Sequence, residues 1–152
     1  MRRLAPFALA LAAALPARAA PARLGDFSLG GGPAIVVDRN SFGAGATAEA
    51  NLLWRWFSLG MHGRLAAVEG EARPAAGIEL GAFGFFGLGA SLQAAGPSID
   101  GLLQIPIPVY AWQQTYLTVG YRPGLLLGED RGWVHEIAVQ IKWSSLLVPE
   151  TD

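Results

Sequence analysis

The chain of 152 residues contains no cysteine, which excludes disulfide bonds and cysteine metal sites. It contains only two histidines, so no transition-metal site is expected. We expect no other cofactor. Charged residues are scarce at 15%, whereas 52% of the chain is hydrophobic, more than an ordinary soluble domain carries. The body of the chain nevertheless lacks a run of about 18 apolar residues, which a membrane-spanning helix would need. This combination indicates alternating β-strands, whose hydropathy signal per segment is weak.

The N-terminus has the pattern of a secretory signal peptide. Arg2 and Arg3 form a basic start, residues 4–15 are apolar, and Ala17-Arg18-Ala19 is a small-x-small cleavage pattern. We therefore expect export through the Sec pathway and cleavage after Ala19. A membrane anchor is the alternative, but the apolar stretch is shorter than a span.

The expected organisation is a signal peptide at 1–19, one β-barrel domain at 20–143 and a C-terminal tail at 144–152. Three of the 11 basic residues lie in the signal peptide, so the remaining chain has 8 basic and 12 acidic residues, a formal charge of −4. No basic patch remains, and nucleic acid is not an expected partner.

Polar and apolar residues alternate along most of the remaining chain, which is typical of β-strands with two different faces. The segment from His135 to Trp143 alternates over nine residues. Turn signals divide the chain into eight strands of about 10 residues, the length that a tilted strand needs to cross a bilayer. The expected strands are 25–37, 42–53, 57–68, 75–84, 86–95, 102–111, 115–126 and 133–143.

The connections between these strands are of two kinds. Those after the first, third, fifth and seventh strands are polar, at 38–41, 69–74, 96–101 and 128–132. Those after the second, fourth and sixth strands are tight and aromatic, so aromatic side chains gather at one end of an up-and-down meander. Such a rim is typical of the interfacial girdle of a membrane barrel. Its expected members are Trp54, Trp56, Phe57, Phe83, Phe85, Phe86, Tyr110, Trp112, Tyr116 and Trp143.

One face of the expected strands is almost wholly apolar, and the other combines polar residues with glycines. We assign the polar face to a narrow barrel interior, because glycines suit a crowded lumen and the charges on this face balance. An unpaired charge in such a lumen would be destabilising. The interior charge network is expected to contain Glu49, His62, Arg64, Glu79, Arg122, Glu136 and Lys142.

The hairpins suggest partners within this network. Folding the chain about residues 55–56 sets Glu49 opposite His62, and folding about Glu129 sets Arg122 opposite Glu136. Folding about residues 71–72 sets Arg64 opposite Glu79. These pairings are hypotheses, because a slip of two residues would keep the faces and change the partners.

The pattern resembles the small outer-membrane β-barrel proteins, such as the OmpA transmembrane domain and OmpX, over nearly the whole chain after residue 19. The resemblance rests on the signal peptide, eight alternating segments, the aromatic rim and a final strand ending Ile137-x-Val139-x-Ile141-x-Trp143. It implies an outer-membrane location, contact with outer-membrane lipid and a last strand that the assembly machinery reads. Nine residues follow Trp143, where the family usually ends.

No catalytic constellation stands out. His62 and Ser58 share a face but lie about 13 Å apart along a strand, too far for a nucleophile–base pair. Alternation places His135 on the lipid face near the outer rim. Glycine-rich segments 30–32 and 81–84 precede no helix and carry no following lysine, so they are not phosphate loops.

Pro106 and Pro108 predict that the sixth strand is irregular or pairs poorly with one neighbour. The simpler interpretation is a β-bulge. The alternative is a site of weak strand pairing in the barrel wall, where a lipid or a partner could bind.

We therefore expect a structural or interaction barrel of the outer membrane without catalysis. The alternatives are a narrow channel or small-molecule carrier that uses the lumen, and a soluble periplasmic lipocalin-like binding protein. A helical membrane protein is disfavoured by the glycine density and by Glu79 inside the best apolar segment, 78–92. The oligomeric state does not follow from the sequence.

Overall fold

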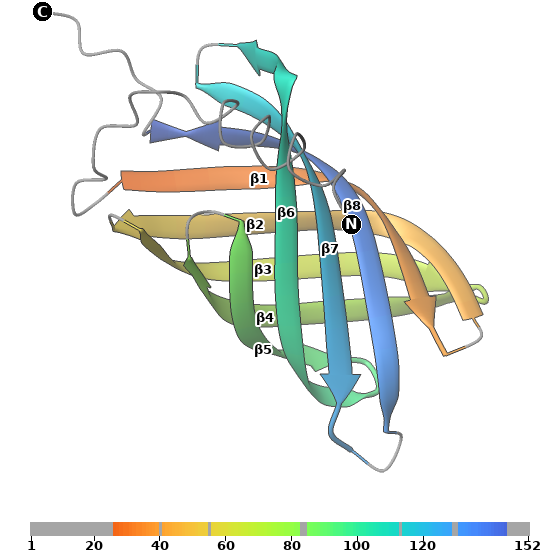
Figure 1. Ribbon diagram of the computed structural model, residues 1–152. Coiled ribbons are helices and arrows are strands. Elements are labelled where there is room, and N and C mark those ends of the chain that lie inside the picture. Colours follow the sequence, from red (N-terminus) through yellow and green to blue (C-terminus); the bar gives the residue numbers. More distant parts are fainter. Residues whose placement is uncertain are drawn as a thin grey trace, which may run out of the picture.

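The computed structural model shows an eight-stranded, closed antiparallel β-barrel (Figure 1). It describes residues 26–39, 41–54, 56–82, 85–112, 114–128 and 131–145, with only the backbone of 108–112. The expected signal peptide and the tail beyond Ser145 lie outside the described residues. The strands are β1 (Asp26–Asp38), β2 (Ser41–Trp54), β3 (Phe57–Val68), β4 (Glu71–Ala82), β5 (Phe86–Gln93), β6 (Gly96–Trp112), β7 (Thr115–Leu126) and β8 (Gly132–Ser144).

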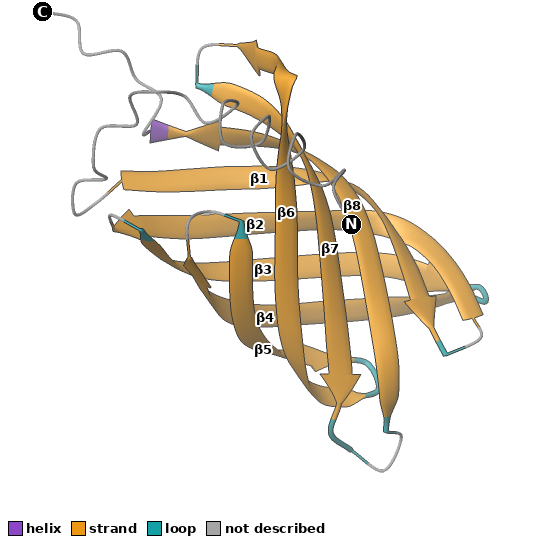
Figure 2. Ribbon diagram, viewed as in Figure 1, coloured by secondary structure: helices purple, strands orange, loops and turns teal. Residues whose placement is uncertain are grey.

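Each strand pairs with its neighbours in sequence, and β1 pairs with β8 to close the barrel. The predicted all-β, up-and-down architecture is therefore confirmed. Figure 2 shows that strands make up nearly all of the described structure. Closure leaves both end strands paired, which removes the open edges that a flat sheet would present.

Two of the expected polar connections are wrong. Glu69 and Gly70 form a two-residue turn with φ of 54° and 82°, so β4 starts at Glu71 instead of residue 75. Two consecutive residues with positive φ suit the twist of a tight hairpin. Likewise, the segment expected to be a loop at 96–101 is the first part of β6. A turn at Ala94 and Ala95 replaces the loop, and Gly96 supplies the positive φ of 123° that follows it.

The start of the C-terminal tail also belongs to the barrel. The Ser144 amide donates to the Gln114 carbonyl at 2.9 Å, so β8 runs one residue beyond Trp143. The Ser145 hydroxyl donates to Asp26 at 3.2 Å and accepts from the Phe27 amide at 2.9 Å. Ser145 thereby ties the end of β8 to the beginning of β1.

Pro106 and Pro108 of β6 lie where the strand has no paired neighbour on the β5 side among the described residues. β5 pairs with β6 only as far as Leu103, and the Gln104 amide then donates to the Phe85 carbonyl at 2.7 Å. Alternate residues of a strand direct their amides to the same side, so the nitrogen of Pro106 faces the side on which β5 has ended. The missing N–H therefore removes no hydrogen bond to β7. The β6–β7 register also shifts between Ile107 and Trp112, which confirms the irregular sixth strand.

The barrel has a polar interior and an apolar exterior. Its buried residues include 17 polar or charged side chains, whereas 26 large hydrophobic side chains are exposed. This distribution is the reverse of that in a soluble domain. A small apolar cluster of Val36, Ala66, Leu126 and Val134 fills the interior toward the end that carries the 69–70 turn.

Candidate functional site

The seven charged residues predicted for the interior are all buried, with no more than 9% of any of them exposed. They come from five strands around the barrel, namely β2, β3, β4, β7 and β8. Inward-facing residues of every strand converge because the barrel is narrow, and eight strands leave just enough room for side chains. The interior is therefore the place where the polar chemistry of the chain is concentrated.

One cluster is centred on Glu49 of β2. Its carboxylate accepts from the Lys142 ammonium of β8, and Lys142 also donates to the Gln104 side-chain oxygen of β6. Gln104 in turn donates to Glu49 at 2.8 Å, and Asn51 donates to Glu49 at 3.0 Å. The carboxylate thus has an ion-pair partner and two amide donors, which compensate for its removal from water.

A second cluster contains two arginine–carboxylate pairs. Arg122 of β7 donates to Glu79 of β4 at 2.7 Å, and Arg64 of β3 donates to Glu136 of β8 at 3.3 Å. Arg64 also donates to Gln93 at 3.1 Å. Both ion pairs span the lumen between strands that are not neighbours, so they hold opposite walls of the barrel together.

His62 of β3 lies between two carboxylates of this second cluster. Its Nδ1 atom is 3.7 Å from Glu79, and its Nε2 atom is 3.8 Å from Asp100 of β6. The other carboxylate oxygen of Asp100 accepts from the Ser98 hydroxyl at 2.8 Å. Ser98 also shares a 2.8 Å hydrogen bond with Ser91, so these serines are arranged around Asp100 and not around the histidine.

The expected hairpin partners are only partly correct. Glu49 lies opposite His62 and Arg122 opposite Glu136, as predicted. Arg64, however, lies opposite Ala75, and Glu79 lies opposite Gly60. The prediction folded this hairpin about residues 71–72, whereas the turn is at 69–70, and the register changes by four residues.

Register also does not decide which charges pair. Arg122 faces Glu136 across β7 and β8 but contacts Glu79 instead. In a narrow closed barrel, long side chains reach across the lumen as easily as along the wall. Sequence reasoning therefore identified charges of the interior but not their partners.

Asp100 is the one buried charged residue among the described residues that the sequence prediction missed. It is 3% exposed, yet Pro97 and the flanking Gly96 and Gly101 led to its assignment to a loop. The register shows it opposite Gly89 of β5 and Gly124 of β7, with its side chain in the lumen. The alternation of Ser98, Asp100 and Gln104 was the available signal, since all three share one face.

Glycines make room for this network. A Cβ atom at Gly77 would lie 2.5 Å from the Ala90 carbonyl oxygen and 2.7 Å from the His62 ring. At Gly60 it would lie 1.9 Å from the Asn51 side chain. Two cavities in the described part of the barrel each have a volume of about 10 Å³, enough for one water molecule.

The aromatic residues expected at one rim are mostly exposed there. Trp54, Trp56, Phe57 and Phe86 are each more than half exposed. Trp143 lies beside Phe27, with ring centroids 5.0 Å apart, so Phe27 is a further member. Phe85 is a partly exposed turn residue. Phe83 lies outside the described residues, as do the side chains of Tyr110 and Trp112.

Tyr116 is a correction to that set. It lies opposite Lys142 and shares the face of the buried Thr118 and Arg122, so its side chain points into the lumen. The prediction grouped Tyr116 with the rim because it follows a tight aromatic connection. The inward and outward alternation of side chains along β7 would have placed it in the lumen.

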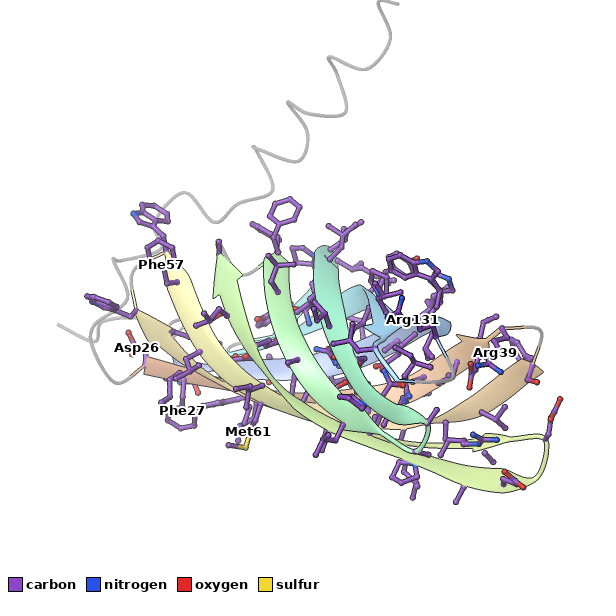
Figure 3. All side chains as sticks on the ribbon, turned by 90° about the horizontal axis from the view of Figure 1, so that it is seen from below. Asp26, Phe27, Arg39, Phe57, Met61 and Arg131 are labelled. Atoms are coloured by element: carbon purple, nitrogen blue, oxygen red, sulfur yellow. The ribbon has the colours of Figure 1, made fainter. Side chains whose placement is uncertain are left out.

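The opposite end of the barrel carries a second group of aromatic residues. Phe42 and Trp133 are 64% and 54% exposed. The Tyr121 hydroxyl hydrogen-bonds to His135 Nδ1 at 2.8 Å, and the His135 ring stacks with both Tyr121 and Trp133. Figure 3 shows Phe57 near one end of the barrel and Arg39 and Arg131 near the other. Aromatic side chains therefore mark both ends of the apolar outer wall.

A comparison with protein families and with curated proteins finds no match for this chain. Among the described residues, no group of His, Asp and Glu side chains is arranged to hold a metal ion. Within the same ranges, no helix is long and apolar enough to cross a membrane.

Proposed function

We propose that the chain is an outer-membrane β-barrel protein with a structural or interaction role and no catalytic activity. The observation that carries this proposal is the inverted distribution of side chains. Met61, Ile78, Leu80 and Leu88 point outward and are each more than 60% exposed, whereas the buried residues are mainly polar. A soluble protein rarely exposes a large contiguous apolar surface, but a bilayer is a favourable environment for it.

Three further features support a membrane location. Aromatic side chains lie at both ends of the outer wall, as at the two interfaces of a bilayer. The strands have 8 to 17 residues, and most are long enough to cross the hydrocarbon core when tilted. The N-terminal sequence has the pattern of a signal peptide, which would direct the chain out of the cytoplasm. Membership of the small outer-membrane barrel family stays a prediction.

The interior argues against a binding protein of the lipocalin type. Such a protein would need an apolar cavity for its ligand, whereas this lumen is filled by charged and amide side chains. The same filling disfavours a channel, because the described cavities admit about one water molecule each. The turns at Glu69–Gly70 and Ala94–Ala95 are also too short to form an elaborate receptor surface. The outer wall and the rims are therefore the surfaces left for interaction.

The test is expression of the full chain in a bacterium with an outer membrane, followed by fractionation. We expect the protein in the outer-membrane fraction, with a band whose gel mobility changes on boiling. A soluble periplasmic protein with no mobility change would refute the membrane assignment and favour the soluble binding protein. Purified barrel in planar bilayers should give no stepwise conductance, and steady unitary steps would favour the channel instead.

A further inference from the structure

The fully buried charges of the described interior do not balance when the histidine is neutral. Four carboxylates are buried, those of Glu49, Glu79, Asp100 and Glu136. Three cations oppose them: Lys142 pairs with Glu49, Arg122 with Glu79, and Arg64 with Glu136. Asp100 is the carboxylate without an arginine or lysine in these pairs.

The surroundings of Asp100 lack a strong donor for one of its oxygens. Oδ1 accepts from the Ser98 hydroxyl at 2.8 Å. Oδ2 has no hydrogen-bond partner among the described residues, and the nearest basic group is His62, with Nε2 at 3.8 Å. Leaving a buried carboxylate without a counter-charge is strongly destabilising.

His62 is placed to interact with this surplus charge. Its side chain is 2% exposed, and its Nδ1 atom also has no hydrogen-bond partner, at 3.7 Å from Glu79. The other buried charged residues of the described interior face the same lumen as His62. They are Glu49 on β2, Arg64 on β3, Glu79 on β4, Asp100 on β6, Arg122 on β7, and Glu136 and Lys142 on β8. No buried charge is contributed by the described residues of β1 and β5.

A small cavity adjoins these groups. It has a volume of about 10 Å³ and is lined by His62, Asp100, Arg64 and Arg122 among others. One water molecule fits that volume, and a buried water needs two to four polar partners. Such a water would bridge the 3.8 Å separation between His62 and Asp100, which is too long for a direct hydrogen bond.

We propose that the folded barrel binds one proton at a site formed by His62, Glu79 and Asp100 around this cavity. The proton equalises the buried positive and negative charges and supplies the missing hydrogen-bond donor between the imidazole and the two carboxylates. It is shared within the cluster, directly or through a water in the cavity. The proposal concerns the interior alone and does not depend on the membrane location.

The test is the pH dependence of folding, measured by urea unfolding of the detergent-solubilised or vesicle-inserted barrel between about pH 7.5 and 9. In this range an unfolded chain has neutral histidine and ionised carboxylates. A folded state that holds one extra proton should lose about tenfold in its folding constant for each unit of rising pH. A folding equilibrium constant that does not change with pH over this range would overturn the proposal.

Asp100→Asn locates the site, because it removes the surplus charge while keeping a side chain of the same shape. We expect this variant to lose the tenfold dependence, whereas Glu71→Gln, at a carboxylate that is 71% exposed, should retain it. Retention of the full dependence in Asp100→Asn would show that the proton is bound elsewhere and would overturn the site.

A measurement on the unmodified chain keeps the proposal testable if Asp100→Asn does not fold. Refolding at about pH 8 in a weakly buffered solution with a pH-indicator dye should take up about one proton per barrel. Uptake close to zero would refute the proposal. Because this readout follows folding and not cellular location, it is separate from the fractionation that tests the proposed function.

Discussion

Arginine substitutions at increasing depth along the outer face of β3 would test whether that face contacts lipid. Phe57, Leu59 and Met61 all point outward on this strand and are 62%, 53% and 64% exposed. Exposure is therefore similar at the three positions, and what differs is the distance from the aromatic rim. The three variants are Phe57→Arg, Leu59→Arg and Met61→Arg.

The expected magnitudes follow from depth. Met61 lies four residues from Phe57, which is about 13 Å along the strand and about 10 Å along the barrel axis for a strand tilted by about 40°. That position is near the middle of an apolar band about 25 Å tall. Arginine there should lower the free energy of unfolding by about 2–4 kcal/mol, and at the rim by about 0–1 kcal/mol. Leu59→Arg should lie between these values.

The assay is reversible urea unfolding of the barrel in phospholipid vesicles, followed by fluorescence of the five tryptophans. In a soluble barrel the three positions would be ordinary exposed sites, and each substitution would change stability by no more than about 0.5 kcal/mol. Equal small effects at Phe57 and Met61 would therefore refute the assignment of this face to lipid. A gradient that increases toward Met61 would support it.

Three further predictions concern the interior and the irregular strand, each measured by the same unfolding assay. Lys142→Met should lower the free energy of unfolding by about 3–5 kcal/mol, because it leaves Glu49 buried without its cation. Gly77→Ala should be destabilising by about 1–3 kcal/mol, since its Cβ would lie 2.5 Å from the Ala90 carbonyl oxygen. Pro106→Ala should change stability by less than about 0.5 kcal/mol, because the restored amide faces the side that β5 does not cover.

Each of these variants has a matched control. Arg131→Met removes an exposed cation, and Gly63→Ala adds a Cβ whose nearest neighbour is 3.9 Å away, so both should have small effects. Ile105→Pro should be destabilising by about 1–3 kcal/mol, because residue 105 directs its amide toward β7. Equal effects within any pair would contradict the structural reason given for that pair.

The strands and their two faces could be predicted because both depend on a local signal. A period of two places alternate residues on opposite faces whatever the strand pairs with. The faces of Glu49, Arg64, Glu79 and Lys142 therefore follow from neighbours in sequence, and all four are buried. Applied within β7, the same rule predicts that the Tyr116 side chain points into the lumen.

Pairing depends on information that the local pattern lacks. The β3–β4 register is determined by which residues tolerate positive φ, and Glu69 with Gly70 was hidden inside a longer polar segment. Asp100 was obscured by Pro97 and two glycines, which usually indicate a loop. Glycines are tolerated within a barrel strand where it bends or packs closely, and Pro97 lies next to the turn at the start of β6.

The arrangement of the barrel limits where an interaction role could be located. An interior filled by ion pairs contributes stiffness, because Arg122–Glu79 and Arg64–Glu136 join opposite walls, but it offers a ligand almost no volume. The described turns at Glu69–Gly70 and Ala94–Ala95 offer a partner little surface. The outer wall is large, but lipid would cover it in a membrane. The part of β6 beyond Gln104 differs from the rest of the wall, because it has no paired strand on the β5 side among the described residues. Unpaired backbone is tolerated in a bilayer only outside the hydrocarbon or where something covers it. If the outer face is embedded as proposed, this stretch of β6 is expected to lie at the interface or under a covering segment.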